Sequence, residues 1–407
     1  MIGTLSAKFM IMLAGIFCVR ILGKEIYGQY GMIKSTINLI MVIGGSGLGL
    51  TATKYISQYK VAHKERIPSV YGVTNLFAVV VAFTLAILVF LFADFLSIDL
   101  LHEKNLIEPM KIGALILFMI TINLGQEGVL AGFEDFKSKS INLFIGNFIQ
   151  GILMVLGAYH YSLVGAVIGY GMGVVLIIAL NKRSINKNFK KLNIHFSFKK
   201  IDIKDLQLLY RYSLPATIST ILAAPTFWLI RTILVRHTGG FGEVAIFDVS
   251  DQWKTLILFI PAAVCQIALP ILSSIDNDET GKFWRVLNLN ILINVSVALV
   301  MAFVVACCSP IILSFYGEGF RDNWPMIILA LSCIFTSIST VLGVSISSLA
   351  KMWTWCTFNT LWAIVLISLS WLFVGYGWGA KGVALAVLLS YMEHAIVQYV
   401  YLKIVRR

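Results

Sequence analysis

Ionisable side chains stand inside several of the most apolar stretches of this 407-residue sequence. Asp248, Asp251 and Lys254 follow one another at intervals of three residues, so a helix would present all three on one face. Arg231 and Lys34 lie in two earlier apolar stretches. A charge at the centre of a bilayer costs about 2.5 to 3.5 kcal/mol on the insertion scale, so the retained ones usually face a water-filled cavity or an opposite charge. This pattern predicts the binding of a charged group or an ion.

The composition indicates what surrounds these charges. Hydrophobic residues make up 58% of the chain and charged residues only 13%, whereas soluble domains carry about a quarter charged residues. Several apolar runs reach the ~20 residues that cross a bilayer. The sequence therefore predicts an all-α polytopic membrane protein with about twelve transmembrane helices, near residues 3–22, 30–56, 68–93, 110–131, 141–159, 163–180, 208–236, 243–272, 284–309, 324–349, 356–375 and 380–402.

The distribution of the net charge of +12 predicts how the chain is oriented. With the N-terminus in the cytoplasm, most Lys and Arg residues fall in loops on the cytoplasmic side, as the positive-inside rule requires. The basic segment 181–205 is the strongest example. We therefore expect both termini in the cytoplasm, and we interpret the positive charge as a topology signal rather than as a surface for nucleic acid.

The second half of the sequence resembles the first at an offset of 217 residues, which matches Gly23 with Gly240 and Tyr30 with Phe247. A stripe of small residues spaced by four lets a neighbouring helix approach closely. The repeat predicts two parallel six-helix bundles, 1–180 and 206–407, joined by a linker at 181–205, with a central cavity between the bundles. The matched stripes are Gly165, Gly169 and Gly173 in the first half and Gly382, Ala386 and Ser390 in the second.

Three segments in the first 140 residues resemble a known family. Val19–Tyr30, with the sequence VRILGKEIYGQY, resembles the R-x-L-G-x-x-x-[YF]-G-x-Y segment that ends the first helix of polysaccharide flippases. Gly44–Leu50 is similar to the glycine-rich second helix of that family, and Leu130–Phe136 is similar to the turn after its fourth helix. The family is the oligosaccharide-lipid branch of the multidrug/oligosaccharidyl-lipid/polysaccharide (MOP) exporter superfamily, typified by Wzx-type O-antigen flippases.

The resemblance implies a MATE-like fold and a flippase that works by alternating access. Its cargo would be undecaprenyl-pyrophosphate-linked oligosaccharide repeat units, for O-antigen or another surface polysaccharide, moved from the cytoplasmic to the outer leaflet of a bacterial inner membrane. Expected partners are this polyprenyl-linked oligosaccharide, membrane lipids, a polysaccharide polymerase and a chain-length regulator. We expect no enzymatic activity and no cofactor or metal, and the sequence leaves open whether transport is coupled to protons or sodium.

The basic residues in the spans would then hold the pyrophosphate. Lys34, Arg231 and Lys254, together with Arg20, would form a cationic cavity lining, because an anion in a low-dielectric cleft needs several donors and Arg offers a bidentate fork. The alternative is that the intramembrane charges only pair with one another, or that Arg20 and Arg231 extend to a membrane interface.

The acidic residues in the spans have two candidate roles. Asp248 and Asp251 would limit the positive charge of the empty cavity or hydrogen-bond sugar hydroxyls. Glu127, Asp248 and Asp251 are the candidates for ion coupling, because carboxylates can bind a proton or a sodium ion.

Two other functions remain as alternatives. A cation-coupled multidrug exporter of the same superfamily would favour an acidic cavity, whereas the ionisable residues here include at least as many bases as acids. A membrane-embedded polysaccharide polymerase would need a large outer loop with catalytic residues, and the longest outer loop expected here is Asp94–Glu108.

Overall fold

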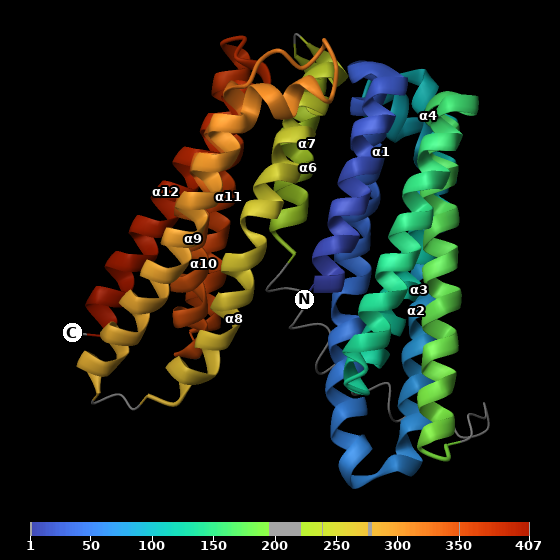
Figure 1. The fold of residues 1–407 in the computed structure, drawn as a ribbon, viewed down its shortest axis with the longest axis vertical. Coiled ribbons are helices and arrows are strands. Elements are labelled where there is room, and N and C mark those ends of the chain that lie inside the picture. The colour runs from blue at the N-terminus through green and yellow to red at the C-terminus, as the bar shows by residue number, and fades with distance from the viewer. Residues whose placement is uncertain (1, 195–220, 238, 276–278, 350, 407) are drawn as a thin grey trace. The chain divides into compact units, whose positions relative to one another are not determined.

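The computed structural model describes residues 2–194, 221–237, 239–275, 279–349 and 351–406, and every regular element in these ranges is helical (Figure 1). Eight helices in them are long and apolar enough to cross a membrane. The polytopic all-α class is thereby confirmed. The main helices are α1 (Ile2–Ala62), α2 (Ile67–Leu91), α3 (Ile107–Gly132), α4 (Phe136–Lys191), α6 (Ala223–Arg236), α7 (Gly240–Ile257), α8 (Phe259–Ser273), α9 (Thr280–Ser314), α10 (Trp324–Ser348), α11 (Met352–Gly375) and α12 (Gly379–Val405).

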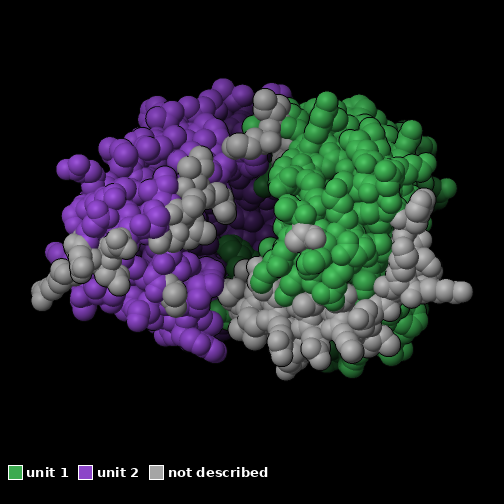
Figure 2. Space-filling view, turned by 90° about the horizontal axis from the view of Figure 1, so that it is seen from below, with its two compact units in different colours: residues 1–228 green, residues 229–407 purple. Residues whose placement is uncertain are grey.

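The chain divides into two compact units, unit 1 with residues 1–228 and unit 2 with residues 229–407 (Figure 2). In unit 1, α3 packs against α1, α2 and α4; in unit 2, α10 packs against α7, α8, α9 and α12. The linker predicted at 181–205 falls partly on α4, which continues to Lys191, and partly on 195–220, which lie outside the described residues. The domain boundaries and the number of spans stay predictions.

The long helix α4 is a hairpin of two helices, because the backbone leaves helical geometry at Tyr161 (φ −133°) and Ser162 (φ +51°). Glycines on both arms of α4 let the two arms touch. A Cβ added at Gly146, Gly157, Gly165, Gly169 or Gly173 would collide with the opposite arm. The close approach predicted for the stripe Gly165–Gly173 is therefore confirmed, and the neighbour is the other arm of the same hairpin. The facing pairs are Gly157 with Gly165, Leu153 with Gly169, Gln150 with Gly173 and Gly146 with Ile177.

Backbone breaks recur at matched positions of the two units. Gly23 (φ +76°) interrupts α1, and its match Gly240 (φ +48°) begins α7. Ser162 turns the α4 hairpin, and Gly379 (φ +48°), which lies 217 residues later, begins α12. Because residues with a Cβ rarely adopt positive φ, this agreement supports the internal repeat that the sequence predicts.

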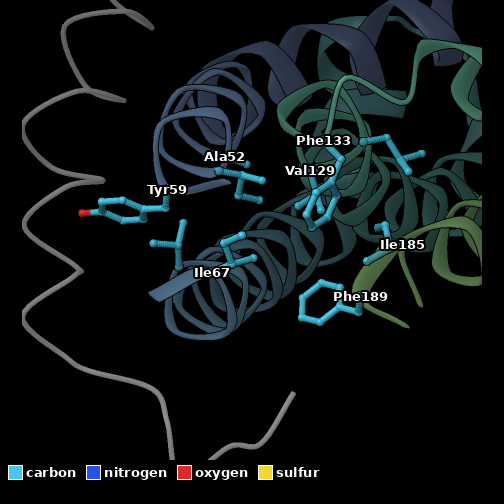
Figure 3. Close-up of a cluster of buried hydrophobic side chains, with 10 residues drawn as sticks. Ala52, Tyr59, Ile67, Val129, Phe133, Ile185 and Phe189 are labelled. Atoms are coloured by element: carbon cyan, nitrogen blue, oxygen red, sulfur yellow. The ribbon is translucent and has the colours of Figure 1, made fainter. Parts of the chain in front are cut away.

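An apolar cluster joins all four helices at one end of unit 1 (Figure 3). Ala52 comes from α1, Ile67 from α2, Phe133 from the end of α3, and Ile185 and Phe189 from α4. The rings of Phe133 and Phe189 meet edge to face, with centroids 5.8 Å apart. The turn between α3 and α4 is thus anchored in the core.

Hydrogen bonds hold the same turn from two sides. Lys60, near the end of α1, donates from Nζ to the carbonyl oxygen of Phe133 at 3.1 Å. Asp135 caps α4, because its Oδ1 accepts from the backbone N–H of Ser138 at 3.1 Å. Its Oδ2 accepts from Nδ2 of Asn188, in the second arm of the hairpin, at 2.8 Å. One carboxylate therefore fixes both the beginning and the end of α4.

Asp135→Ala is expected to destabilise the protein by about 1–2 kcal/mol, through loss of the helix cap and of the bond to Asn188. Burial alone would raise the pKa of Asp135, but the hydrogen bonds from Asn188 and Ser138 hold it below its ordinary value. A lowered carboxylate pKa stabilises the fold above the unfolded-state value of about 4, and this contribution disappears as pH falls toward the lowered value.

Thermal unfolding of the detergent-solubilised protein, measured from neutral pH to about pH 3, checks this expectation. The gap between wild type and Asp135→Ala should narrow at the acid end. Glu134→Gln is the control, because that carboxylate is 65% exposed and its ion pair with Lys60 contributes little. Equal melting temperatures for wild type and Asp135→Ala at neutral pH would contradict the role given to this carboxylate.

Candidate functional site

Four ionisable residues of unit 2 form a charge cluster: Arg231 on α6 and Asp248, Asp251 and Lys254 on α7. Arg231 Nε donates to Oδ1 of Asp248 at 2.7 Å, and Nη2 reaches Oδ2 of Asp251 at 3.5 Å. Lys254 Nζ lies 3.8 Å from Oδ1 of Asp251. The three α7 residues therefore lie on one helix face, as their spacing predicts.

The turn between α6 and α7 brings Arg231 to that face. Gly239 (φ +105°) and Gly240 (φ +48°) both have positive φ, and a Cβ on Gly239 would also collide with the side chain of Glu243. Glycine is the residue that adopts this geometry without steric cost. The chain can therefore turn back on itself tightly enough for Arg231, within α6, to meet Asp248, at the middle of α7.

The charge cluster is largely buried and formally neutral. The side chains of Arg231 and Asp248 are each 12% exposed, that of Lys254 is 5% exposed, and that of Asp251 is 25% exposed. Two cations balance two anions, which keeps charged groups tolerable in a low-dielectric interior. Pairing is thus observed for all four residues, and Asp251 is the member most accessible from outside.

Two aromatic rings complete the charge cluster. The guanidinium carbon of Arg231 lies 5.1 Å from the ring centroid of Phe247, and Nζ of Lys254 lies 5.2 Å from that of Tyr391 on α12. Each distance is within cation–π range. Tyr391 has no signal in the sequence, because it is far along the chain from α7 and stands in an unremarkable apolar stretch.

The other basic candidates lie in unit 1. Arg20 and Lys34 are exposed on α1, on either side of the break at Gly23. Their part in a shared cationic lining, and the central cavity itself, stay predictions.

Glu127 begins a chain of polar contacts inside unit 1. Its Oε2 pairs with Lys139 at 3.2 Å, and its Oε1 accepts from Nδ2 of Asn123 at 2.9 Å. Asn123 in turn accepts from Asn181, and Asn181 accepts from Asn142, both at 2.9 Å. A half-buried carboxylate is therefore connected to three buried amides on α3 and both arms of α4.

The donor sets of the described residues do not suit a metal. In the ranges that the structure covers, no group of three or more His, Cys, Asp or Glu residues is placed to hold a metal ion. The charge cluster combines two carboxylates with two cations, an arrangement that suits exchange with an anion or a proton.

A protein-family model described as "Polysaccharide biosynthesis protein" matches residues 1–276. The chain is 21% identical over 298 residues to the "EPS I polysaccharide export inner membrane protein EpsE" of Ralstonia nicotianae, which covers 70% of this chain and 65% of that protein. It is 24% identical over 197 residues to the protein of the same name from Ralstonia solanacearum, covering 46% and 44%. The matches thus span less than two thirds of the length of these relatives.

Solved structures resemble the whole chain. The inward-facing conformation of a multidrug resistance MATE family transporter of the MOP superfamily has a TM-score of 0.83 at 16% identity, covering 98% of this chain and 94% of that one. The lipid II flippase MurJ in an inward closed conformation has a TM-score of 0.78 at 17% identity, covering 99% and 87%. The MATE-like fold expected from the sequence is confirmed.

Proposed function

This chain belongs to the family of polysaccharide biosynthesis proteins, and on that premise we propose that it is a flippase for lipid-linked oligosaccharides. Its cargo is a repeat unit of O-antigen or another surface polysaccharide, carried on undecaprenyl pyrophosphate. The protein moves this cargo from the cytoplasmic to the outer leaflet of the inner membrane by alternating access. The EpsE relatives, named as inner-membrane polysaccharide export proteins, support this cargo class.

The observation that carries the proposal is the buried pairing of Arg231 with Asp248 and Asp251. A pyrophosphate oxygen and a carboxylate oxygen accept the same bidentate hydrogen bonds from a guanidinium. An entering pyrophosphate can therefore exchange with the carboxylates without leaving the Arg231 charge unpaired. Lys254, held between Asp251 and the ring of Tyr391, supplies the second positive charge.

The remaining candidates extend this site. Lys34 and Arg20 of unit 1 would add positive charge to the cavity lining when cargo is bound. The carboxylates that the pyrophosphate displaces, Asp248 and Asp251, would accept hydrogen bonds from sugar hydroxyls. The cargo's negative head would then be held by bases and its sugars by acids.

Ion coupling, topology and partners complete the proposal. Glu127, Asp248 and Asp251 are the carboxylates proposed to exchange a proton or sodium ion during the cycle. Both termini face the cytoplasm, and a polysaccharide polymerase and a chain-length regulator receive the cargo on the outer side.

Deleting the gene and analysing the lipid-linked oligosaccharides by mass spectrometry tests this function. We expect repeat units to accumulate on the lipid carrier, inaccessible to a probe added from outside, while the surface polysaccharide disappears. A plasmid copy of the wild-type gene should reverse both changes. The accumulated species would identify the sugars of the cargo.

The same strain separates the alternatives. Unchanged glycans together with increased sensitivity to cationic drugs would overturn the proposal in favour of a multidrug exporter. Repeat units that reach the outer leaflet but remain unpolymerised would instead indicate a polymerase.

A further inference from the structure

A second buried polar group in unit 2 surrounds His394, on α12. One ring nitrogen, Nδ1, lies 2.9 Å from Oγ of Ser339 on α10, and the other, Nε2, lies 3.0 Å from Nε2 of Gln398 on α12. His394, Ser339 and Gln398 are all buried, with Gln398 fully enclosed. We call these three residues the His394 site.

The hydrogen-bond donors determine the charge state of the ring in this arrangement. The side-chain nitrogen of Gln398 can only donate, so Nε2 of His394 accepts from it. Nδ1 then carries the ring proton and donates to Ser339. With the Gln398 amide in this orientation the imidazole is neutral, and Oε1 of Gln398 is left buried without a hydrogen-bond partner.

Oε1 of Gln398 is the hydrogen-bond acceptor that a protonated His394 ring would need for its Nε2–H group. Turning the side-chain amide of Gln398 over exchanges its oxygen with its nitrogen at nearly the same place. The oxygen then accepts from an Nε2–H group, while Ser339 continues to accept from Nδ1–H. The same three side chains thus satisfy the hydrogen bonds of both the neutral ring and the imidazolium.

The charges around His394 connect it to the charge cluster. On α12 the neighbours are Tyr391, whose ring centroid is 6.5 Å from that of His394, and Glu393, which has a buried Oε2. Lys254 of α7, which is paired with Asp251, lies over the same Tyr391 ring, with Nζ 5.2 Å from its centroid.

The helices α10 and α11 contribute one titratable thiol and one aromatic ring to the surroundings of His394. From α10, Cys333 Sγ lies 3.8 Å from the carbonyl oxygen of Lys254, and α11 contributes the ring of Trp362, 6.2 Å from that of His394. Lys254 therefore opposes a positive charge on His394, whereas Glu393 and Asp251 favour one.

The fold does not require an imidazole here. In the internal repeat, His394 corresponds to Ile177 of unit 1, which is also buried and packs against Gly146. An aliphatic side chain is thus sufficient at the matched position. A buried histidine with two satisfied nitrogens is therefore better explained by its chemistry than by packing.

We propose that His394 is a reversible proton-binding site whose protonation is coupled to anion binding at the charge cluster. An anion that draws Arg231 and Lys254 toward itself contributes negative charge and leaves Asp251 less neutralised. Both changes favour a proton on His394. The proton-binding site is independent of the proposed function; the coupling rests on it.

Nuclear magnetic resonance of the full-length protein, labelled with ¹⁵N-histidine in lipid nanodiscs, tests the site directly. His394→Gln identifies the His394 signals by their loss, and His160→Gln, a change at an exposed histidine, is the matched control. We expect the His394 nitrogens to titrate reversibly within the pH range over which the protein stays folded. Inorganic pyrophosphate, as the anion probe, should raise the midpoint.

Two substitutions at Gln398 test the hydrogen-bond mechanism. Gln398→Leu removes the acceptor for the protonated ring and should lower the midpoint. Gln398→Glu places a carboxylate beside Nε2 and should raise it by about 1–3 pH units. The opposite signs keep the test decisive if one variant does not fold.

Three outcomes decide the proposal. A His394 ring that stays neutral over the whole range in folded protein overturns it. Titration that ignores pyrophosphate retains the proton site but overturns the coupling. Titration that responds to pyrophosphate supports both parts, even if the deletion strain shows a different physiological cargo.

Discussion

Arg231→Met is expected to abolish transport and to destabilise the protein by about 3–5 kcal/mol, because it leaves the buried carboxylate of Asp248 without its cation. Such a loss is a large part of a typical stability of about 5–15 kcal/mol. Thermal unfolding in detergent and recovery of surface polysaccharide in the deletion strain measure the two effects. Arg321→Met is the control, because the Arg321–Glu318 pair is almost fully exposed and its removal should change neither quantity.

The double variant Arg231→Met with Asp248→Leu separates binding from structural support. Replacing both partners by apolar side chains removes the uncompensated charge, and such exchanges are often neutral for stability. We therefore expect a melting temperature near that of wild type and no transport. A double variant that restores surface polysaccharide would show that the pair only stabilises the fold, and the pyrophosphate site would have to be abandoned.

Gly165→Ala is expected to prevent the α4 hairpin from closing, because the new Cβ would collide with the backbone carbonyl of Gly157 in the opposite arm. Backbone atoms cannot move aside as a flexible side chain can. Overpacking of this kind costs about 1–3 kcal/mol or more, and every pair farther along the hairpin would be displaced with it. The yield of monodisperse protein on size-exclusion chromatography should fall severely.

Gly281→Ala provides the matched comparison, since a Cβ at this glycine of α9 meets nothing within 4 Å. It should be neutral, or stabilising by up to about 1 kcal/mol through helix propensity. If Gly165→Ala is recovered as well as Gly281→Ala, the two arms of α4 do not pack as closely as described.

The sequence predicts those features that depend on local periodicity. The spacing of Asp248, Asp251 and Lys254 places them on one helix face. The four-residue spacing of Gly165, Gly169 and Gly173 indicates a close helix contact. Both follow from the pitch of an α-helix. The prediction of a membrane protein follows from amino-acid composition, which, like helix periodicity, does not depend on tertiary structure.

The partners across helices could not be predicted in the same way. The ion pair of Arg231 with Asp248 depends on the turn at Gly239, and the contact of Lys254 with Tyr391 depends on how α12 packs in unit 2. Neither has a signal in local spacing. The sequence therefore left open whether these charges pair or face a cavity, and the geometry shows pairing within unit 2.

The formal neutrality of the charge cluster has an electrical consequence. A single charge that crosses the whole membrane potential exchanges about 2.3 kcal/mol with it per 100 mV. Arg231 and Lys254 balance Asp248 and Asp251, so rigid displacement of the empty cluster along the field performs almost no net electrical work. As long as these four side chains stay paired, the cluster itself therefore adds almost no voltage dependence to a conformational change.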